Sequence, residues 1–373
     1  MAKYPPKEKL SVEHFTGCML GGAVGDALGA PVEFLTLQQI QSRYGQNGIT
    51  DYVEFENQIG EFTDDTQMSL FTAEALLRAH HRATLKGVGG ALNKIAHQSY
   101  LRWLHTQNIG VNPENSKNNI VDVKKGWLIN QHGLFKRRAP GNTCIAALAS
   151  GSAGTLTNPI NNSKGCGTIM RMAPVGLMIY GNPENAFQTA CELSAITHGH
   201  PTGYLSAGFF AALISDLAVG IELKKAIDKA IKMLTQRENH NETLKAVQAA
   251  LFMYESSKSD PGHPTPEALE KLGQGWIAEE ALAISLYASL IYENDFEKGV
   301  LFSINHSGDS DSTGSITGNI LGLIHGIDKI PPKWIHNLKD SALVEQVGKD
   351  LHLRIKGNSS EPNDEWWEKY PGF

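Results

Sequence analysis

The sequence of 373 residues predicts an all-α protein. Apolar side chains recur at helical spacing in one segment after another, and two stretches carry glycines four residues apart, which favours close helix packing. Evidence for strands is thin, because only residues 49–55 have an ambiguous pattern. We find no solenoid repeat and no linker long enough to separate domains. We therefore predict one compact multi-helix domain over residues 1–373, with its core at about 11–355 and an aromatic tail at 356–373.

The helix boundaries follow from capping residues, prolines and apolar periodicity. Ser11 precedes the first apolar stripe and Pro31 ends it, and Thr36 stands before a short second helix. Asn142 is a candidate cap, and Asn182 is followed by Pro183 in the first helical position. Helices are expected at residues 11–29, 36–44, 63 to about 82, 92–107, 142–150, 182 to about 197, 202–219, 222–235, 241–254, 265–273, 276–292, 296–304 and 314–326, with one more after residue 332.

Composition excludes several classes of function. The net charge is −6, and the only block of basic residues is at 136–138, which we interpret as a solvated turn. A nucleic-acid partner is therefore not expected. The four cysteines form no CxxC pair, so we predict buried free thiols in a reducing compartment rather than disulfides or a zinc site.

The N-terminal stretch has some features of a signal peptide, because lysines precede the apolar residues 15–24. However, Glu13 and His14 interrupt the junction, and Asp26 lies just beyond the apolar run. We interpret the stretch as a folded helix and the protein as cytoplasmic. Since no apolar run reaches the length of a membrane span, a membrane partner is not expected either.

Glycines form two ridges on predicted helices. The first glycine ridge is Gly21, Gly25 and Gly29, and the second lies at residues 314, 318, 322 and 326. Each glycine costs a helix about 1 kcal/mol relative to alanine, so close backbone approach is the expected compensation. No strand precedes the first ridge, which excludes a dinucleotide-binding fingerprint.

Two acidic clusters are the strongest chemical signal. Residues 306–314 read His-Ser-Gly-Asp-Ser-Asp-Ser-Thr-Gly, and residues 63–66 read Thr-Asp-Asp-Thr at a predicted helix start. Hard divalent cations such as Mg²⁺ take carboxylate and hydroxyl oxygens as ligands. Our hypothesis is that the clusters meet and hold metal. On spacing alone, a pair of Asp-rich helix N-caps explains them equally well.

Three further features are weaker. Residues 163–167 are small apart from one lysine and could bring backbone N–H groups to an anion, although an ordinary flexible loop is the commoner explanation. His198 and His200 suit a helix end or a ligand contact better than a metal site. Glu33 follows the first helix, where most carboxylates are simply exposed.

Taken together, six stretches resemble one family over nearly the whole chain. They are residues 21–33 (GGAVGDALGAPVE), 60–68 (GEFTDDTQM), 164–177 (KGCGTIMRMAPVGL), 197–201 (THGHP), 276–286 (WIAEEALAISL) and 306–322 (HSGDSDSTGSITGNILG). In this order they resemble the ADP-ribosylglycohydrolases (ADP-ribosylhydrolases), which include dinitrogenase-reductase-activating glycohydrolases and ADP-ribosylarginine hydrolases.

The resemblance implies a compact helical fold with two Mg²⁺ ions, for which Mn²⁺ is a substitute. The implied metal ligands are Thr63, Asp64, Asp65, Asp309, Asp311 and Ser312. Many relatives carry threonine at position 312, and the serine form resembles the arginine-directed branch. The implied diphosphate loop is Ser163, Lys164, Gly165, Cys166 and Gly167. His198 matches a residue near bound ADP-ribose, and Glu33 matches a mobile glutamate near the metals.

The implied activity is Mg²⁺-dependent removal of ADP-ribose from protein arginine, through an oxocarbenium-like state. Asp65 and Glu33 are the candidate catalytic carboxylates, with Asp65 preferred. The implied partner is an ADP-ribosylated protein, ADP-ribose is the product, and a monomer is expected rather than an oligomer. The alternatives are hydrolysis of O-linked ADP-ribose (from serine or O-acetyl-ADP-ribose), a catalytically silent ADP-ribose-binding protein, and a two-metal phosphohydrolase.

Overall fold

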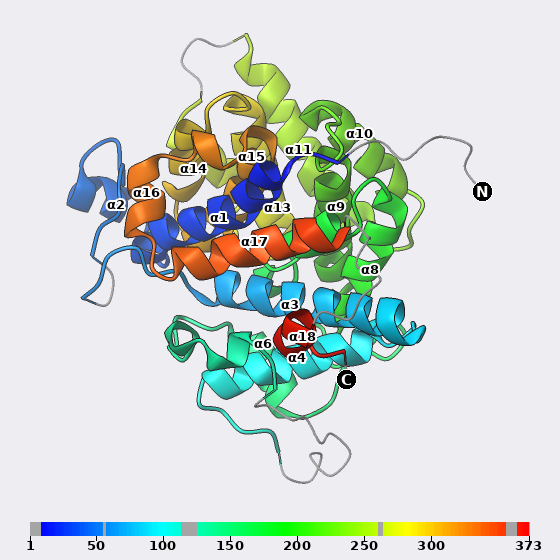
Figure 1. Cartoon of the computed structure of the whole chain (residues 1–373). Coiled ribbons are helices and arrows are strands. Elements are labelled where there is room, and N and C mark those ends of the chain that lie inside the picture. Colours follow the sequence, from blue (N-terminus) through cyan, green and yellow to red (C-terminus); the bar gives the residue numbers. More distant parts are fainter. Residues whose placement is uncertain (1–8, 55–56, 113–124, 260–263, 356–363, 373) are drawn as a thin grey trace.

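The computed structural model describes residues 9–54, 57–112, 125–259, 264–355 and 364–372 (Figure 1). Within these ranges the regular structure is helical and no strand occurs, which confirms the predicted all-α class. The α-helices are α1 (Val12–Gly29), α2 (Leu37–Tyr44), α3 (Asp64–Lys86), α4 (Leu92–Thr106), α6 (Asn142–Ala149), α7 (Ala173–Met178), α8 (Pro183–Ala195), α9 (Pro201–Leu217), α10 (Leu223–Leu234), α11 (Asn241–Ser257), α12 (Pro266–Leu269), α13 (Ala278–Ile291), α14 (Phe296–Ile304), α15 (Ser310–His325), α16 (Pro332–Asn337), α17 (Ser341–Ile355) and α18 (Asp364–Lys369).

Helix α1 lies at the centre of the packing. It is buried continuously from Phe15 to Gly29, because α15 and α17 both pack against it (Figure 1). A Cβ added to Gly348 of α17 would lie 2.8 Å from the Cα of Thr16, so this contact is close as well. Since α1 is covered on several sides, it has no polar face, unlike a surface helix.

The two glycine ridges pack directly against each other. A Cβ on Gly21 would stand 2.3 Å from the carbonyl oxygen of Gly318, and one on Gly25 would stand 2.0 Å from that of Gly314. Gly17 extends the first ridge, since its added Cβ would lie 2.4 Å from the carbonyl oxygen of Gly322. The order of these pairs makes α1 and α15 antiparallel, so the end of α1 lies beside the start of α15.

Several local predictions need correction. Residues 49–54, whose sequence pattern is ambiguous, are irregular, and Gly141, not Asn142, occupies the N-cap position of α6. Helix α15 begins at Ser310, so the acidic motif is part of the helix instead of preceding it. The basic block is not a uniformly solvated turn, because Arg138 is buried and pairs with Glu61.

The aromatic end of the chain folds back onto the helices of the body. Tyr370 is fully buried, its hydroxyl donates to Asp350 at 2.6 Å, and its carbonyl oxygen lies 2.9 Å from Nδ1 of His81. Residues 356–363, the first part of the predicted tail, lie outside the described residues. The four cysteines are free thiols, three of them buried and Cys166 half-buried.

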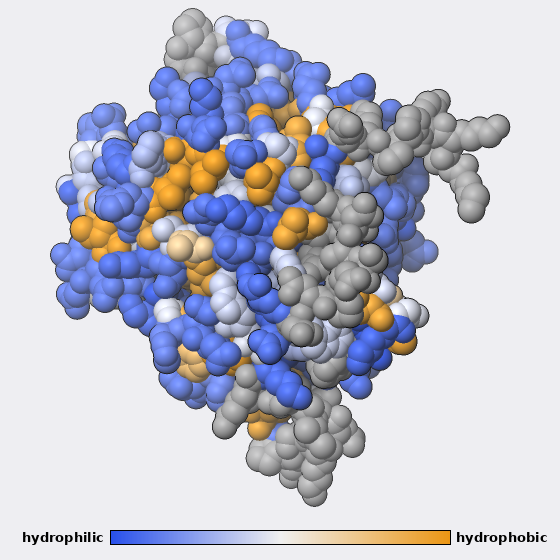
Figure 2. Space-filling model, viewed as in Figure 1, coloured by the Kyte–Doolittle hydropathy of each residue, from blue (hydrophilic) through white to orange (hydrophobic). Residues whose placement is uncertain are grey.

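Among the described residues, no single helix combines the length and apolar content needed to cross a membrane. The bent pair Val12–Val32 and Leu37–Tyr44, with an angle of 89°, meets that criterion only when its two parts are counted together. The face drawn in Figure 2 is mainly hydrophilic, and its apolar side chains form separate patches.

Candidate active site

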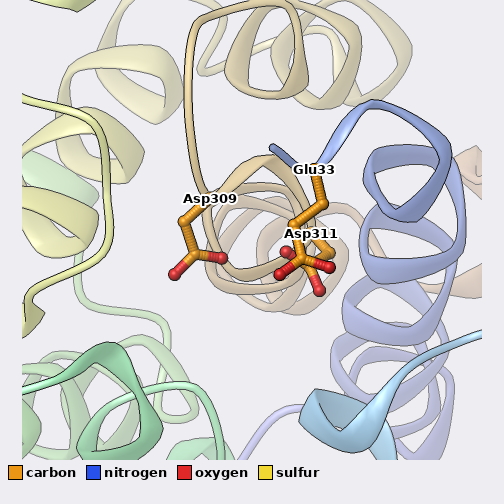
Figure 3. A group of neighbouring side chains, drawn as sticks. All are labelled: Glu33, Asp309 and Asp311. Carbon is orange, nitrogen blue, oxygen red and sulfur yellow. The ribbon is translucent and has the colours of Figure 1, made fainter. Parts of the chain in front are cut away.

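The antiparallel glycine contact places three acidic side chains together. Glu33 follows the 3₁₀ turn Ala30–Val32 at the end of α1, while Asp309 and Asp311 open α15. Oxygen atoms of these three carboxylates lie within 4.8 Å of one another (Figure 3). Figure 3 shows them converging from the ends of the two helices. The close backbone approach of α1 to α15 is therefore what brings Glu33 to the acidic motif.

The second acidic cluster joins the same cavity through α3. Asp64 and Asp65 form the first turn of α3, and both line a cavity of about 300 Å³ together with Glu33, Asp309 and Asp311. Thr63 is the N-cap residue, and its hydroxyl accepts a hydrogen bond from the backbone N–H of Asp65 at 3.3 Å. The two clusters, which lie more than two hundred residues apart in sequence, do meet.

Asp26, which the sequence reasoning did not assign, holds this helix start in place. Its carboxylate accepts hydrogen bonds from the backbone N–H of Thr63 at 2.8 Å and of Thr66 at 3.0 Å, and from the Thr66 hydroxyl at 2.5 Å. It is completely buried on α1, one residue beyond Gly25. Its neighbours on the ridge were the only sequence signal, because its partners on α3 are visible only in the fold.

Burial and mutual repulsion dominate the electrostatics of the cluster. Desolvation, followed by the charge of Asp311, raises the pKa of Asp26 to about 7 and that of Glu33 to about 11. The same two causes raise the pKa values of Asp65 and Asp309 well above their ordinary values. So many carboxylates cannot all ionise in a buried site without a compensating positive charge.

The arrangement fits a hard divalent cation. Buried carboxylate oxygens of Glu33, Asp65, Asp309 and Asp311 have no hydrogen-bond partner. Asp309 occupies an N-cap position, yet its side chain caps nothing, which speaks against the helix-cap explanation for this cluster. Unpaired carboxylate oxygens beside a hydroxyl such as Ser312 form the donor set that Mg²⁺, Mn²⁺ or Ca²⁺ takes.

The glycine loop and His198 form another part of the wall. Gly165, Cys166 and Gly167 line the cavity, and a Cβ on Gly167 would lie 3.3 Å from Nε2 of His198. Nδ1 of His198 lies 2.8 Å from the hydroxyl of Thr197. A side chain in place of Gly167 would crowd the imidazole, because its Cβ would lie 3.0 Å from Cε1 of His198.

A buried arginine lies close to His198 and adds to the effect of burial on its protonation. Arg171 is fully buried and donates to the Thr197 hydroxyl at 2.6 Å. Its guanidinium lies 4.4 Å from the ring centre of Tyr100. Desolvation, together with the charge of Arg171, lowers the pKa of His198 to about 3. The imidazole is therefore neutral near pH 7.

Three of the predicted site residues do not belong to the cavity wall. Thr63 is fully buried and does not line it. Burial raises the pKa of Asp311, and a hydrogen bond from Thr63 opposes part of that rise. Ser163 is tied to the hydroxyl of Thr143 at 3.2 Å. The Lys164 ammonium binds Glu279 at 2.5 Å and Glu242 at 2.9 Å, so this lysine is engaged in ion pairs instead of facing the cavity.

The cavity also has walls that sequence reasoning missed. Residues 139–144 line it, and the backbone N–H of Gly141 donates to Asp64 at 3.2 Å. Phe34 and Trp276 line it as well, and their rings stack with centres 5.0 Å apart. No single local pattern marked these residues as cavity wall, because they come from separate parts of the chain: Phe34 follows the turn after α1, residues 142–144 begin α6, and Trp276 precedes α13.

Comparison with known proteins agrees with this geometry. An ADP-ribosyl-[dinitrogen reductase] glycohydrolase of Rhodospirillum rubrum is 26% identical over 326 residues, covering 86% of this chain and 89% of the relative. ADP-ribosylarginine hydrolase Tri1 of Serratia proteamaculans is 24% identical over 349 residues, covering 92% and 80%. An uncharacterized protein of Archaeoglobus fulgidus is 28% identical over 351 residues, covering 92% and 98%.

A solved structure and a family model extend these similarities. The structure, named ADP-ribosylglycohydrolase-related protein complex, has a TM-score of 0.60 at 22% identity, covering 92% of this chain and 98% of that one. At this identity the likeness establishes a shared fold. The model of the ADP-ribosylglycohydrolase family matches residues 7–361. Because this match spans nearly the whole sequence, the chain belongs to the ADP-ribosylglycohydrolase family.

Proposed function

We propose that this protein is a Mg²⁺-dependent hydrolase that removes ADP-ribose from modified protein by cleaving the N-glycosidic bond to arginine. One observation carries the proposal. A single cavity collects the carboxylates of both acidic clusters and Glu33, and four of them present a buried oxygen without a partner. A glycine loop lines the same cavity, so one ligand can contact both parts.

The metal centre is proposed to contain two Mg²⁺ ions, for which Mn²⁺ is a substitute. The ligands would be Asp64, Asp65, Asp309, Asp311 and Ser312, which line the cavity, together with Thr63, which is buried next to Asp64 at the start of α3. When bound, the ions would supply the positive charge that orients ribose hydroxyls and favours deprotonation of water. Mutual repulsion of the carboxylates, described above, is the physical reason for this site to accept two positive ions.

The substrate is proposed to lie along the cavity from the carboxylates to the glycine loop. Its ribose would lie at the carboxylates, and its diphosphate beside the glycine loop at residues 165–167, which lines the other part of the cavity. His198 lies beside Gly165 and Gly167, and Nε2 of its neutral imidazole can form a hydrogen bond to the same ligand. Lys164 is left out of this proposal, because its ammonium is already paired with two glutamates.

Asp65 is the proposed general base, with Glu33 as the second candidate. A carboxylate takes a proton from the attacking water while the bond from ribose C1 to the guanidine nitrogen breaks through an oxocarbenium-like state. Water adds to C1, the nitrogen leaves with a proton, and free ADP-ribose and arginine result. Both carboxylates line the cavity and have one unpartnered oxygen, so each can reach a bound water.

Two observations support arginine as the linkage. The relative from Serratia proteamaculans is named for ADP-ribosylarginine hydrolysis. The family resemblance stated above also associates serine at position 312 with the arginine-directed branch. We therefore propose that the protein cleaves the arginine linkage in preference to an O-linked one.

A panel of ADP-ribosylated arginine, serine and cysteine peptides, each with Mg²⁺ and with EDTA, tests the proposal. Release of ADP-ribose from the arginine peptide, abolished by EDTA, is expected. Release from serine but not arginine would overturn the linkage. AMP as the product would indicate cleavage of the diphosphate instead, and binding of ADP-ribose without turnover of any linkage would indicate a silent member.

Matched variants connect the activity to the cluster. D311N should abolish turnover while the fold is retained, whereas D228N, which changes an exposed carboxylate on α10, should leave turnover unchanged. Near wild-type activity in D311N would refute the metal assignment.

A further inference from the structure

Phe34 combines two costly features at the mouth of the cavity. Its side chain is 68% exposed, which is unusual for a phenylalanine. Its backbone adopts φ of +70°, a left-handed conformation that residues other than glycine, asparagine and aspartate rarely take. Strained backbone conformations persist where the surrounding structure imposes them and often occur at ligand-binding sites.

Backbone hydrogen bonds impose this conformation. The N–H of Phe34 donates to the carbonyl oxygen of Gly308, and the N–H of Gly308 donates to that of Leu35, both at 3.3 Å. The carbonyl oxygen of Trp276 accepts from the N–H of Cys166 at 3.0 Å. Phe34 is thus held beside Gly308 and Trp276 beside Cys166, and their rings stack with an interplanar angle of 26°.

The stacked pair lies at the carboxylate end of the cavity. Phe34 directly follows Glu33, and its partner Gly308 directly precedes Asp309. A Cβ on Gly275, the neighbour of Trp276, would lie 3.2 Å from Cβ of Asp309. An aromatic surface therefore borders the group of unpaired carboxylates, and one ring of it stays open to solvent.

We propose that Phe34, stacked on Trp276, is the subsite for the guanidinium group of the ADP-ribosylated arginine, and so selects arginine over serine. This inference rests on the proposed function. Cleavage at the carboxylate end puts the leaving group at the cavity mouth, where Phe34 lies. A planar cation gains from an aromatic face beside negative charge, whereas the neutral oxygen of a serine linkage gains little.

The adenine ring is the competing occupant, because it too would stack on a flat aromatic surface. The observations favour the guanidinium, since Phe34 is held between Glu33 and the loop before Asp309, at the carboxylate end. The diphosphate is proposed to lie at the other part of the wall, and adenine lies beyond the diphosphate.

The test compares F34L with F34Y and with the wild type. Leucine keeps apolar bulk and removes the π face, while tyrosine keeps the ring. Three measurements are made for each protein with Mg²⁺ present: kcat/KM on an arginine-linked peptide, kcat/KM on a serine-linked peptide, and inhibition by free ADP-ribose. W276L serves as the second variant, because it removes the ring that supports Phe34.

F34L and W276L should lower kcat/KM on the arginine-linked peptide by about 3- to 30-fold, the range expected for one cation–π contact. F34Y should lose less of this kcat/KM than F34L, because tyrosine keeps the aromatic face. Inhibition by ADP-ribose, and any turnover of the serine-linked peptide, should not change. F34G provides the folding control, because glycine accepts the positive φ and should unfold at no lower temperature than F34L.

Two results would overturn the inference. If F34L weakened inhibition by ADP-ribose as strongly as it lowered arginine-linked turnover, the pair would bind the adenosine part instead. If F34L left arginine-linked turnover unchanged, the pair would not contact the leaving group. Both results differ from failure of the proposed function, in which the wild type itself would not cleave the arginine-linked peptide.

Discussion

The carbonyl oxygen of Gly314 lies only 2.0 Å from the point where a Cβ on Gly25 would stand. No side chain fits between α1 and α15 at this crossing. The contact lies close to Asp26 in α1 and to Asp311 in α15. Packing and site geometry therefore depend on the same two glycines.

The first prediction concerns this contact. G25A should destabilise the protein by about 3 kcal/mol or more, because overpacking of a close backbone contact forces the helices apart. It should also lower activity by displacing Glu33 relative to Asp309. Chemical unfolding and turnover measure the two effects. G89A is the matched control, since nothing lies within 4 Å of an added Cβ there. Equal stability of the two variants would contradict the prediction.

The second prediction concerns Asp26, which acts through α3 and not on the substrate. D26N replaces one acceptor oxygen with an NH₂ group. This donor would face the backbone N–H of Thr63 or Thr66, which are donors themselves, so one hydrogen bond would be lost. We expect a loss of about 10- to 100-fold in Mg²⁺ affinity or activity, as for other residues that orient metal ligands. The Mg²⁺ concentration that gives half-maximal activity should rise. A lower kcat with unchanged Mg²⁺ dependence would argue against this role.

The third prediction concerns Mg²⁺ and pH. The pKa of Asp26 is raised from 3.8 to about 7, and that of Glu33 from 4.5 to about 11. Their stabilising contribution is complete below the unfolded pKa values and is lost as pH rises through the folded ones. Without metal, the unfolding temperature should therefore fall from pH 5 to pH 8 on account of these groups.

Mg²⁺ should offset this loss, and its effect should be larger at pH 8 than at pH 5, where protons compete for the carboxylates. At a concentration 100 times its Kd, a ligand contributes about 2.7 kcal/mol. Thermal unfolding with Mg²⁺ or EDTA gives the measurement. A shift of equal size at both pH values, or an undiminished shift in D311N, would contradict the proposed site.

The fourth prediction concerns His198, whose pKa is lowered from 6.5 to about 3. Below pH 6.5 the His198 side chain binds a proton in the unfolded chain but stays unprotonated in the folded protein. Stability is therefore lost as pH falls from 6.5 towards 3, by roughly 2 kcal/mol at pH 5. The sign is opposite to that for the carboxylates. H198Q should remove this part of the pH dependence, while H105Q, at an exposed position, should not. If the stability of wild type and H198Q changed with pH in the same way, the prediction would be wrong.

Local sequence was sufficient for much of the fold. The Thr36 capping box, Asn182 before Pro183 and the apolar stripes correctly predicted helices, because capping and periodicity act between residues a few positions apart. The glycine ridges predicted close helix contact before the partner was visible. The acidic motifs were found as candidate ligands, whereas the pattern of residues 49–55 left helix, strand and loop undecided.

Only the tertiary structure decided which of these groups meet and which protonation states they favour. The pairing of Gly25 with Gly314 set Glu33 beside Asp309, and the fold gave Asp26 its partners on α3. It also directed Lys164 to two glutamates and stacked Phe34 on Trp276. The physical reason is one of range. Helix formation is governed by neighbours in sequence, whereas desolvation, charge repulsion and ring stacking depend on neighbours in space, which residues hundreds of positions away provide.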